Sequence, residues 1–324
     1  MAHAINSSAV GATPERSCMA MTEAIRFSPA KSRLKPYRAS TFVIFFAIQY
    51  ANRQLKSAFA FDTSKNVMAV VMKSRIELSG KTAIVTGGTR GLGRDIAARL
   101  AESGCSVFIC SRNAPESLPD GVTFESCDIR DADQAKAFVD KVAAKTGRID
   151  ILVNNAGGSP PHEASTASSR FAEAIVRLNM LGPLYMSQAA YPYMAKAGSG
   201  SIVNIASVSG ARPSPGTAIY GAAKAGLINL TQSLAQEWGK EGIRVNAIIA
   251  GLMTTENAEA TYGDAEAQAK VGASMPLGRM GIGDDLAGAV LWLVSDLAQW
   301  VSGARLQVDG GGERPYFLDL VKGA

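Results

Sequence analysis

Seven short apolar runs alternate along the chain with longer segments in which apolar residues recur at the period of a helix. The runs are Thr82–Thr86, Ser106–Cys110, Val122–Cys127, Ile149–Val153, Ser201–Ala206, Arg244–Ile249 and Arg305–Val308. Strands that are apolar along most of their length are typical of a parallel sheet with helices on both faces. The pattern therefore predicts an α/β fold, a doubly wound parallel sheet of about seven strands.

The segments between these runs predict helices over residues 91–104, 131–146, 168–197, 217–241 and 284–296. From Lys81 to the C-terminus the chain has 244 residues, enough to bury the core of a single domain. In sheets of this class, ligands bind at the carboxyl ends of the strands, where the strand order reverses. We expect the chemistry of this chain at that edge.

A glycine-rich turn directly follows the first predicted strand, and a helix follows the turn. Such a turn alone is weak evidence, because glycine is frequent in loops, but strand, turn and helix in this order indicate a dinucleotide site. Glycines let the backbone approach a pyrophosphate, and the helix N-terminus offers it free N–H groups. The predicted contacts are Gly87, Thr89, Arg90, Gly91, Leu92 and Gly93.

A tyrosine and a lysine four residues apart, Tyr220 and Lys224, follow Ser207 by thirteen and seventeen residues. On a helix this spacing places both side chains on one face. A free phenol has a pKa of about 10, and a neighbouring ammonium would lower it. The alternative is a solvated helix face with this spacing by chance. Together with the hydroxyl of Ser207, the pair predicts a general acid/base site.

The chain resembles the single-domain short-chain dehydrogenases/reductases, which have a Rossmann-like fold, from about Lys73 to Gly312. Besides the glycine turn and Tyr220–Lys224, the matching motifs are Asp128-Ile129, Asn154-Asn155-Ala156-Gly157, Asn179, Ser207 and Val308-Asp309-Gly310-Gly311. The resemblance implies that Tyr220 transfers the proton, Ser207 holds the substrate oxygen, and Lys224 binds the nicotinamide ribose and lowers the tyrosine pKa. Asn179 would anchor a water linked to Lys224, or would simply bond to its own helical turn.

The same resemblance implies further cofactor contacts. These are Asp128, Ile129, Asn155, Ala156, Gly157, Gly251 and Thr255, in addition to Tyr220 and Lys224. The chain departs from the family at Ala250-Gly251, where proline-glycine is common. Without the proline, an N–H is restored and the turn beside the nicotinamide is expected to be looser.

The end of the second strand predicts NADP(H) in preference to NAD(H). A carboxylate at this position would bind the ribose hydroxyls of NAD, whereas this strand ends in Ser111-Arg112. A guanidinium at Arg112 suits a 2′-phosphate, and Arg90 adds a second cation from the glycine turn. The alternative is that each arginine is merely exposed.

The net charge of +5 is concentrated at the N-terminus. Residues 1–72 contain nine Lys/Arg and three Asp/Glu, so the remaining residues sum to −1 and no nucleic-acid partner is indicated. Three of the four cysteines, Cys105, Cys110 and Cys127, lie in or beside predicted strands and are expected to be buried thiols. With two histidines in the chain, we predict no metal site.

Residues 1–72 lack sustained periodicity and are expected to be a disordered or spurious extension to a domain over residues 73–324. Translation beginning at Met72 or Met68 is one interpretation, and it predicts a cytoplasmic protein. The alternative is an organelle transit peptide, whose Arg/Ser-rich, acid-poor composition this segment shares. Its apolar run, residues 42–48, is too short to span a bilayer, so no membrane partner is expected.

The predicted substrate is a small ketone or secondary alcohol. A 3-oxoacyl-(acyl-carrier-protein) reductase is the alternative enzyme, and it would need a basic docking patch; the candidates are Arg170, Arg177, Arg212 and Arg279. Two other functional classes compete with an enzyme. One is a non-catalytic nucleotide-binding regulator, and the other is an interaction protein that acts through the N-terminal extension. The resemblance implies a homotetramer, or else a dimer, and residues 252–280 are expected to form a lid.

Overall fold

The computed structural model describes residues 76–315 and 317–321, all within one compact unit. The prediction made for residues 1–72 lies outside the described residues. Among the residues described, no helix has the length and apolar character needed to cross a membrane.

Seven parallel strands form one sheet in the order β3-β2-β1-β4-β5-β6-β7. They are β1 (Thr82–Thr86), β2 (Ser106–Ser111), β3 (Val122–Ser126), β4 (Ile151–Asn154), β5 (Gly200–Ser207), β6 (Ile243–Ala250) and β7 (Arg305–Val308). Strand β1 pairs with β2 on one side and with β4 on the other, so the order reverses there. The predicted doubly wound sheet is confirmed, with bounds within two residues of the predicted ones.

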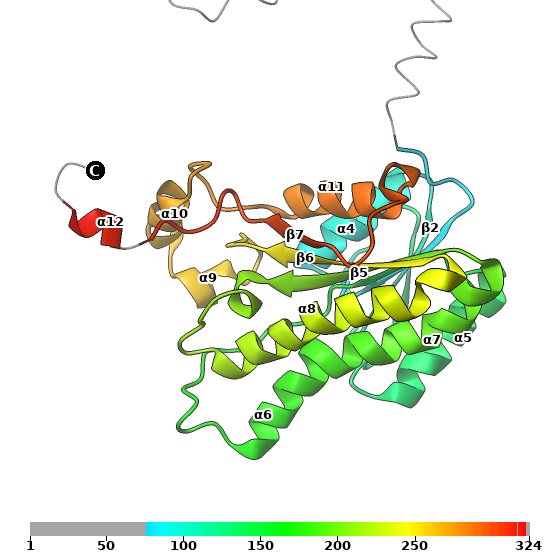
Figure 1. The fold of residues 1–324 in the computed structure, drawn as a ribbon, viewed down its shortest axis with the longest axis horizontal. Coiled ribbons are helices and arrows are strands. Elements are labelled where there is room, and N and C mark those ends of the chain that lie inside the picture. Colours follow the sequence, from blue (N-terminus) through cyan, green and yellow to red (C-terminus); the bar gives the residue numbers. More distant parts are fainter. Residues whose placement is uncertain (1–75, 316, 322–324) are drawn as a thin grey trace, which may run out of the picture. The chain divides into compact units, whose positions relative to one another are not determined.

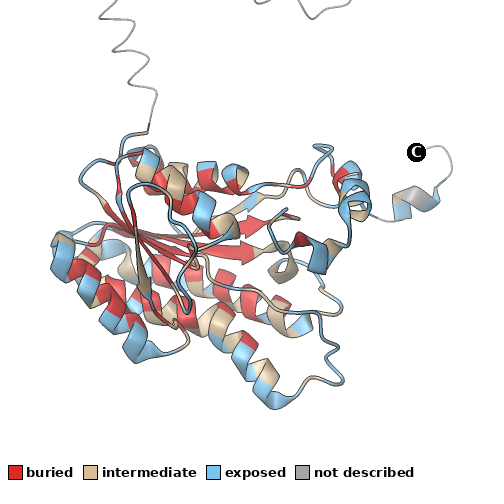
Figure 2. Ribbon diagram, turned by 180° about the vertical axis from the view of Figure 1, so that it is seen from behind, coloured by how far each residue is buried: buried red, intermediate tan, exposed pale blue. Residues whose placement is uncertain are grey.

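Helices cover both faces of the sheet (Figure 1). On one face lie α4 (Gly91–Glu102) and α11 (Gly283–Val294); on the other lie α5 (Ala132–Thr146), α7 (Gly182–Ala197) and α8 (Ala218–Trp238). Side chains of a strand alternate between the two faces. Ala83 and Val85 accordingly pack in the α4–α11 core, and Ile84 packs in the other. The central strands are buried almost throughout (Figure 2).

The helix predicted over residues 168–197 is interrupted. It consists of α6 (Ser169–Val176), a π-helical segment η1 (Arg177–Leu181) and α7. In an α-helix the carbonyl of Asn179 would accept a bond from the N–H of residue 183, but that residue is Pro183 and has none. The amide of Gly182 bonds instead to the carbonyl of Arg177, five residues back. The helical bond that Pro183 cannot make thus falls at Asn179, within the widened segment.

The remaining elements are short. Three 3₁₀ turns lie at η2 (Val208–Gly210), η3 (Gly239–Glu241) and η4 (Asp296–Ala298). The segment predicted as a lid contains α9 (Ala258–Tyr262) and α10 (Ala265–Ser274), and α12 (Phe317–Leu320) lies near the C-terminus. Cys105, Cys110 and Cys127 are buried free thiols, as predicted.

Candidate active site

The predicted catalytic side chains meet at the carboxyl end of β5. Ser207 is the last residue of that strand, and Tyr220 and Lys224 lie on the first two turns of α8. Ser207 hydrogen-bonds to the Tyr220 phenol, and the Lys224 ammonium lies 5.7 Å from the centre of the Tyr220 ring. Side chains that the sequence separates by seventeen positions therefore form one cluster.

Lys224 is 2% exposed and has no carboxylate partner within the described residues. Its ammonium donates a hydrogen bond of 2.7 Å to the backbone carbonyl of Ile205. Burial lowers the pKa of Lys224 to about 8, because desolvation disfavours the charged form. The lysine is consequently able to gain or lose a proton near neutral pH.

The Tyr220 phenol behaves differently from the expectation. Its pKa is raised, first because the ring is buried; the hydrogen bond from Ser207 lowers it in part, and nearby Tyr262 raises it further. The predicted lowering by Lys224 was therefore wrong for the protein alone. The physical reason is that burial disfavours the phenolate, while the ammonium is directed at the Ile205 carbonyl.

Asn179 is fully buried, and its side chain is fully engaged. The amide donates to the carbonyls of Gly158 and Ile175, both at 2.9 Å, and its Oδ1 accepts from the amide of Gly158 at 2.8 Å. A Cβ built on Gly157 would lie 2.7 Å from this Oδ1 and 3.0 Å from the Lys224 ammonium. The π-helical segment thus brings Asn179, Gly157 and Lys224 together.

The glycine turn after β1 forms a close-packed cradle. Gly87 and Gly91 have positive φ angles of 64° and 53°, which L side chains rarely adopt. A Cβ on Gly93 would lie 2.3 Å from both the Asn155 amide nitrogen and the Gly87 carbonyl oxygen. Asn155 in turn donates to the carbonyls of Thr86 and Gly87 at 3.0 and 3.2 Å. The loop after β4 therefore holds the turn in place.

Replacing Gly93 by Ala should disrupt this cradle. The added methyl group has no room, because backbone of the turn lies in its place. We expect at least a ten-fold loss of nicotinamide cofactor affinity and a destabilisation of about 1–3 kcal/mol. Gly288→Ala is the matched control, since a Cβ there would meet nothing within 4 Å on its helix. Fluorescence titration and thermal unfolding of both variants measure the difference; equal behaviour would contradict the assignment.

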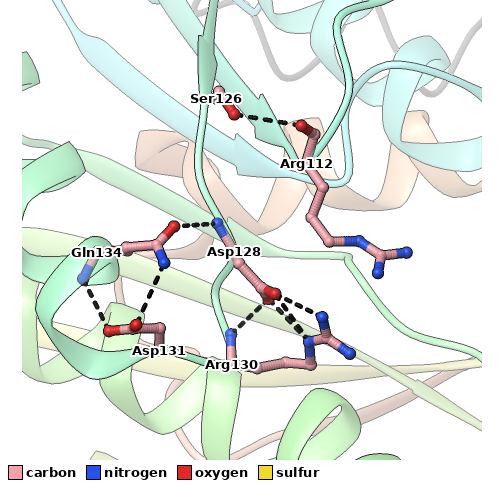
Figure 3. A network of polar contacts seen from close by, with 6 residues as sticks. All are labelled: Arg112, Ser126, Asp128, Arg130, Asp131 and Gln134. Carbon is pink, nitrogen blue, oxygen red and sulfur yellow. Dashed lines mark hydrogen bonds and ion pairs between the residues drawn. The ribbon is translucent and has the colours of Figure 1, made fainter.

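A second polar cluster lies at the ends of β2 and β3 (Figure 3). The Ser126 hydroxyl donates to the carbonyl of Arg112, and the Ser111 hydroxyl donates to the carbonyl of Asn113. Asp128 accepts bonds from Arg130, which lower the pKa of this carboxyl. Ile129, in contrast, is 4% exposed and packs in the core, so only its backbone can face a ligand.

The comparisons with known proteins agree with this geometry. A family model described as enoyl-(acyl carrier protein) reductase matches residues 87–313. The 2-dehydro-3-deoxy-D-gluconate 5-dehydrogenase of Escherichia coli K12 is 36% identical over 246 residues, covering 74% of this chain and 97% of that protein. The 3-oxoacyl-(acyl-carrier-protein) reductase of Staphylococcus aureus Mu50 is 35% identical over 241 residues, covering 71% and 97%.

A solved structure from Sinorhizobium meliloti 1021, described as a short-chain alcohol dehydrogenase, is 33% identical with a TM-score of 0.67, covering 72% of this chain and 97% of that one. The chain belongs to the short-chain dehydrogenase/reductase family. It is an oxidoreductase of this family, whose members use nicotinamide cofactors.

The site of this short-chain dehydrogenase/reductase fits a dinucleotide. The cradle at Gly87 and Gly93 would be filled by a Cβ, and the side chains of Arg90 and Arg112 are exposed. Thr89 and Leu92 lie on the same turn, with Leu92 packed partly against the core. Gly251 packs so closely on Asp309 that a Cβ would lie 2.6 Å from its Cα, so the turn after Ala250 is tight despite the missing proline.

Three residues at the site were not predicted from the sequence. The Glu256 carboxylate accepts a 3.1 Å bond from the amide of Gly91, beside Thr255, and thus caps the glycine turn. Tyr262 of α9 lies close enough to Tyr220 to raise the pKa of its phenol. Arg130 holds Asp128. Only Arg130 carried a sequence signal, its place two residues after Asp128.

Proposed function

We propose that this enzyme is an NADP(H)-dependent oxidoreductase that interconverts a small ketone and its secondary alcohol. The observation that carries the proposal is the cluster of Ser207, Tyr220 and the buried Lys224 at the carboxyl end of β5. A bound nicotinamide would supply or accept the hydride. The chain itself has to supply the proton and to hold the reacting oxygen.

Tyr220 is placed to transfer that proton. Because its raised pKa keeps the phenol protonated at neutral pH, it can donate to the oxygen of a ketone during reduction. The Ser207 hydroxyl, bonded to the same phenol, can hold the substrate oxygen beside it. Lys224, whose pKa is about 8, can then supply a proton that restores the phenol of Tyr220. In oxidation the same groups act in reverse.

The proposed role of Asn179 rests on its backbone rather than its side chain. Its side-chain atoms are bonded to Gly158 and Ile175. Its carbonyl is deprived of the usual helical donor by Pro183. We assign this carbonyl to a water that relays protons to Lys224, whose ammonium and the Asn179 side chain both lie against Gly157.

The preference for NADP(H) is supported by charge at the adenosine end. No carboxylate ends β2, where Ser111 and Arg112 lie, and both Arg90 and Arg112 are exposed. Replacing Ser111 by Asp together with Arg112 by Ala should shift the ratio of kcat/KM values toward NAD by about 10²-fold, because a charge-assisted bond is lost and a like charge added. Equal use of both cofactors by the unmodified enzyme would refute the preference.

A second candidate, 3-oxoacyl-(acyl-carrier-protein) reduction, is favoured by the relative from Staphylococcus aureus. Two of the four arginines predicted as its docking patch are neutralised here. Arg212 pairs with Glu313 at 2.6 Å, and Arg279 pairs with Asp285 at 2.6 and 2.8 Å. Arg170 and Arg177 are exposed on the same helical stretch.

One assay separates these candidates. Oxidation of NADPH is followed with a panel of small ketones, with a 3-oxoacyl thioester of N-acetylcysteamine, and with the same acyl group on carrier protein. Turnover of small ketones supports the proposed function. A large gain on carrier protein over the free thioester identifies the reductase. No turnover of any substrate in the panel, nor of the corresponding alcohols with NADP, favours the non-catalytic regulator.

A further inference from the structure

An ion pair with two-point geometry lies beside Arg112, where the adenosine end of the cofactor is expected. The Arg130 Nε donates to both carboxylate oxygens of Asp128, at 2.9 and 3.0 Å, and its Nη2 donates to Oδ2 at 2.5 Å. The backbone amide of Arg130 adds a 3.1 Å bond to Oδ1. Arg130 alone thus engages both oxygens of this carboxylate.

The turn that carries the pair is well anchored. The amide of Asp131 donates to the carbonyl of Asp128 at 3.0 Å, and the amide of Asp128 donates to the Gln134 side chain at 3.1 Å. Asp131 caps α5 by accepting from the amides of Asp133 and Gln134. The pair is therefore part of the start of α5, unlike a surface pair between two unrestrained side chains.

Arg112 approaches the same carboxylate from the end of β2. Within the described residues its guanidinium has no hydrogen bond or ion pair, and only its backbone carbonyl is engaged, by Ser126. After the bonds from Arg130, the charge of Arg112 also lowers the pKa of Asp128, so the two groups interact. Figure 3 shows the side chains of Arg112 and Arg130 extending to the same side of the loop.

We infer that Arg130 determines cofactor choice, because it engages Asp128 and thereby leaves the Arg112 guanidinium available for a 2′-phosphate. Without Arg130, the carboxylate of Asp128 would pair with Arg112 and would repel the phosphate. With Arg130 in place, Asp128 is neutralised and the charge of Arg112 is available. Arg130 is in this sense a positioning residue, and the inference rests on the proposed NADP(H) dependence.

The test uses nucleotides rather than turnover. Titration calorimetry of the full chain at low ionic strength gives the affinities for adenosine 2′,5′-bisphosphate and for adenosine 5′-monophosphate. Their ratio reports on the 2′-phosphate alone, since adenine contacts cancel. We expect Arg130→Gln to lower this ratio about ten-fold, as expected for the loss of about one charge-assisted bond.

The decisive variant is Arg130→Gln combined with Asp128→Asn. It lacks the carboxylate that would capture Arg112, so the ratio should return to within about three-fold of that of the unmodified enzyme. Arg148→Gln is the matched control. Arg148 pairs with Asp150 at the same spacing of two residues, at 2.6 and 2.8 Å, but at the amino end of β4. It should leave the ratio unchanged.

Each outcome decides one question. An unmodified enzyme that does not prefer the bisphosphate overturns the NADP(H) proposal, and the inference with it. A preference that survives in Arg130→Gln overturns the inference alone. The inference alone also fails if the preference lost in Arg130→Gln does not return when Asp128→Asn is added. Arg130 would then bind the phosphate itself or merely hold the turn. If Arg130→Gln does not fold, Arg130→Lys takes its place, because it keeps the charge without the two-point geometry. We expect it to lower the affinity ratio by a smaller factor, and we expect the addition of Asp128→Asn to restore the ratio.

Discussion

Replacing Tyr220 by Phe should lower kcat by about 10²–10⁴ while leaving the fold and cofactor affinity intact. The change removes the hydroxyl that bonds to Ser207 and little else, since the ring remains to fill its place on α8. Stopped-flow or steady-state assays on the true substrate measure the loss, and titration with cofactor checks that binding is retained.

Tyr193→Phe is the matched control for this experiment. Its hydroxyl donates a 2.8 Å hydrogen bond to Asp140, between α7 and α5, away from the predicted site. It should keep normal turnover and lose at most about 1 kcal/mol of stability. If Tyr220→Phe retains turnover within a few-fold of the unmodified enzyme, the proton comes from another group and the proposed mechanism fails.

Lys224→Met should abolish most activity and yet stabilise the protein. A buried lysine with a pKa of about 8 is destabilising at neutral pH, because folding withdraws a charged group from water. The pKa shift from 10.5 corresponds to a destabilisation of about 3 kcal/mol, which the substitution removes. The substitution also removes the hydrogen bond to Ile205, and this loss offsets about 1 kcal/mol of the gain. We expect a higher melting temperature at pH 7 by about 5 °C.

The pH dependence of stability gives an independent check on Lys224. Between pH 8 and 10.5 the unfolded chain binds the lysine proton and the folded chain does not, so stability rises with pH in this window. Below the folded pKa both states are protonated and the full penalty is present. Lys224→Met should lack this rise, whereas Lys136→Met, at an exposed lysine of α5, should keep it. If the stability of Lys224→Met and that of the unmodified chain change with pH in the same way, burial does not lower the pKa of Lys224.

The fold could be predicted from the sequence because its signals are local and repeated. The apolar runs of the central strands are buried in the sheet, and two glycines of the turn, Gly87 and Gly91, have positive φ angles. The spacing of Tyr220 and Lys224 also follows from helical geometry alone. The ends of α4 and α8 were predicted two and three residues too far, at 104 and 241, whereas α5, which Asp131 and Gly147 cap, lies within one residue of its predicted bounds.

Effects that depend on how deeply a group is buried could not be predicted in this way. The sequence indicated that Lys224 would lower the pKa of Tyr220, but burial raises it, and burial depends on the packing of α8 against β5 and β6. The widening of the helix at Asn179 combines both kinds of information. The sequence shows Pro183, which removes one helical hydrogen bond. The contact of Asn179 with Gly158, however, depends on the fold.

The sequence by itself determined the sheet, the glycine turn, and the identity of the candidate acid/base residues, since these depend on periodicity and on spacing within one element. Only the tertiary structure decided which distant groups touch them. Glu256 reaches the amide of Gly91 across 165 positions, and the engagement of Asp128 by Arg130 beside Arg112 depends on β2 and β3 being neighbours. Such contacts depend on strand order and on the directions of side chains, which no local pattern records.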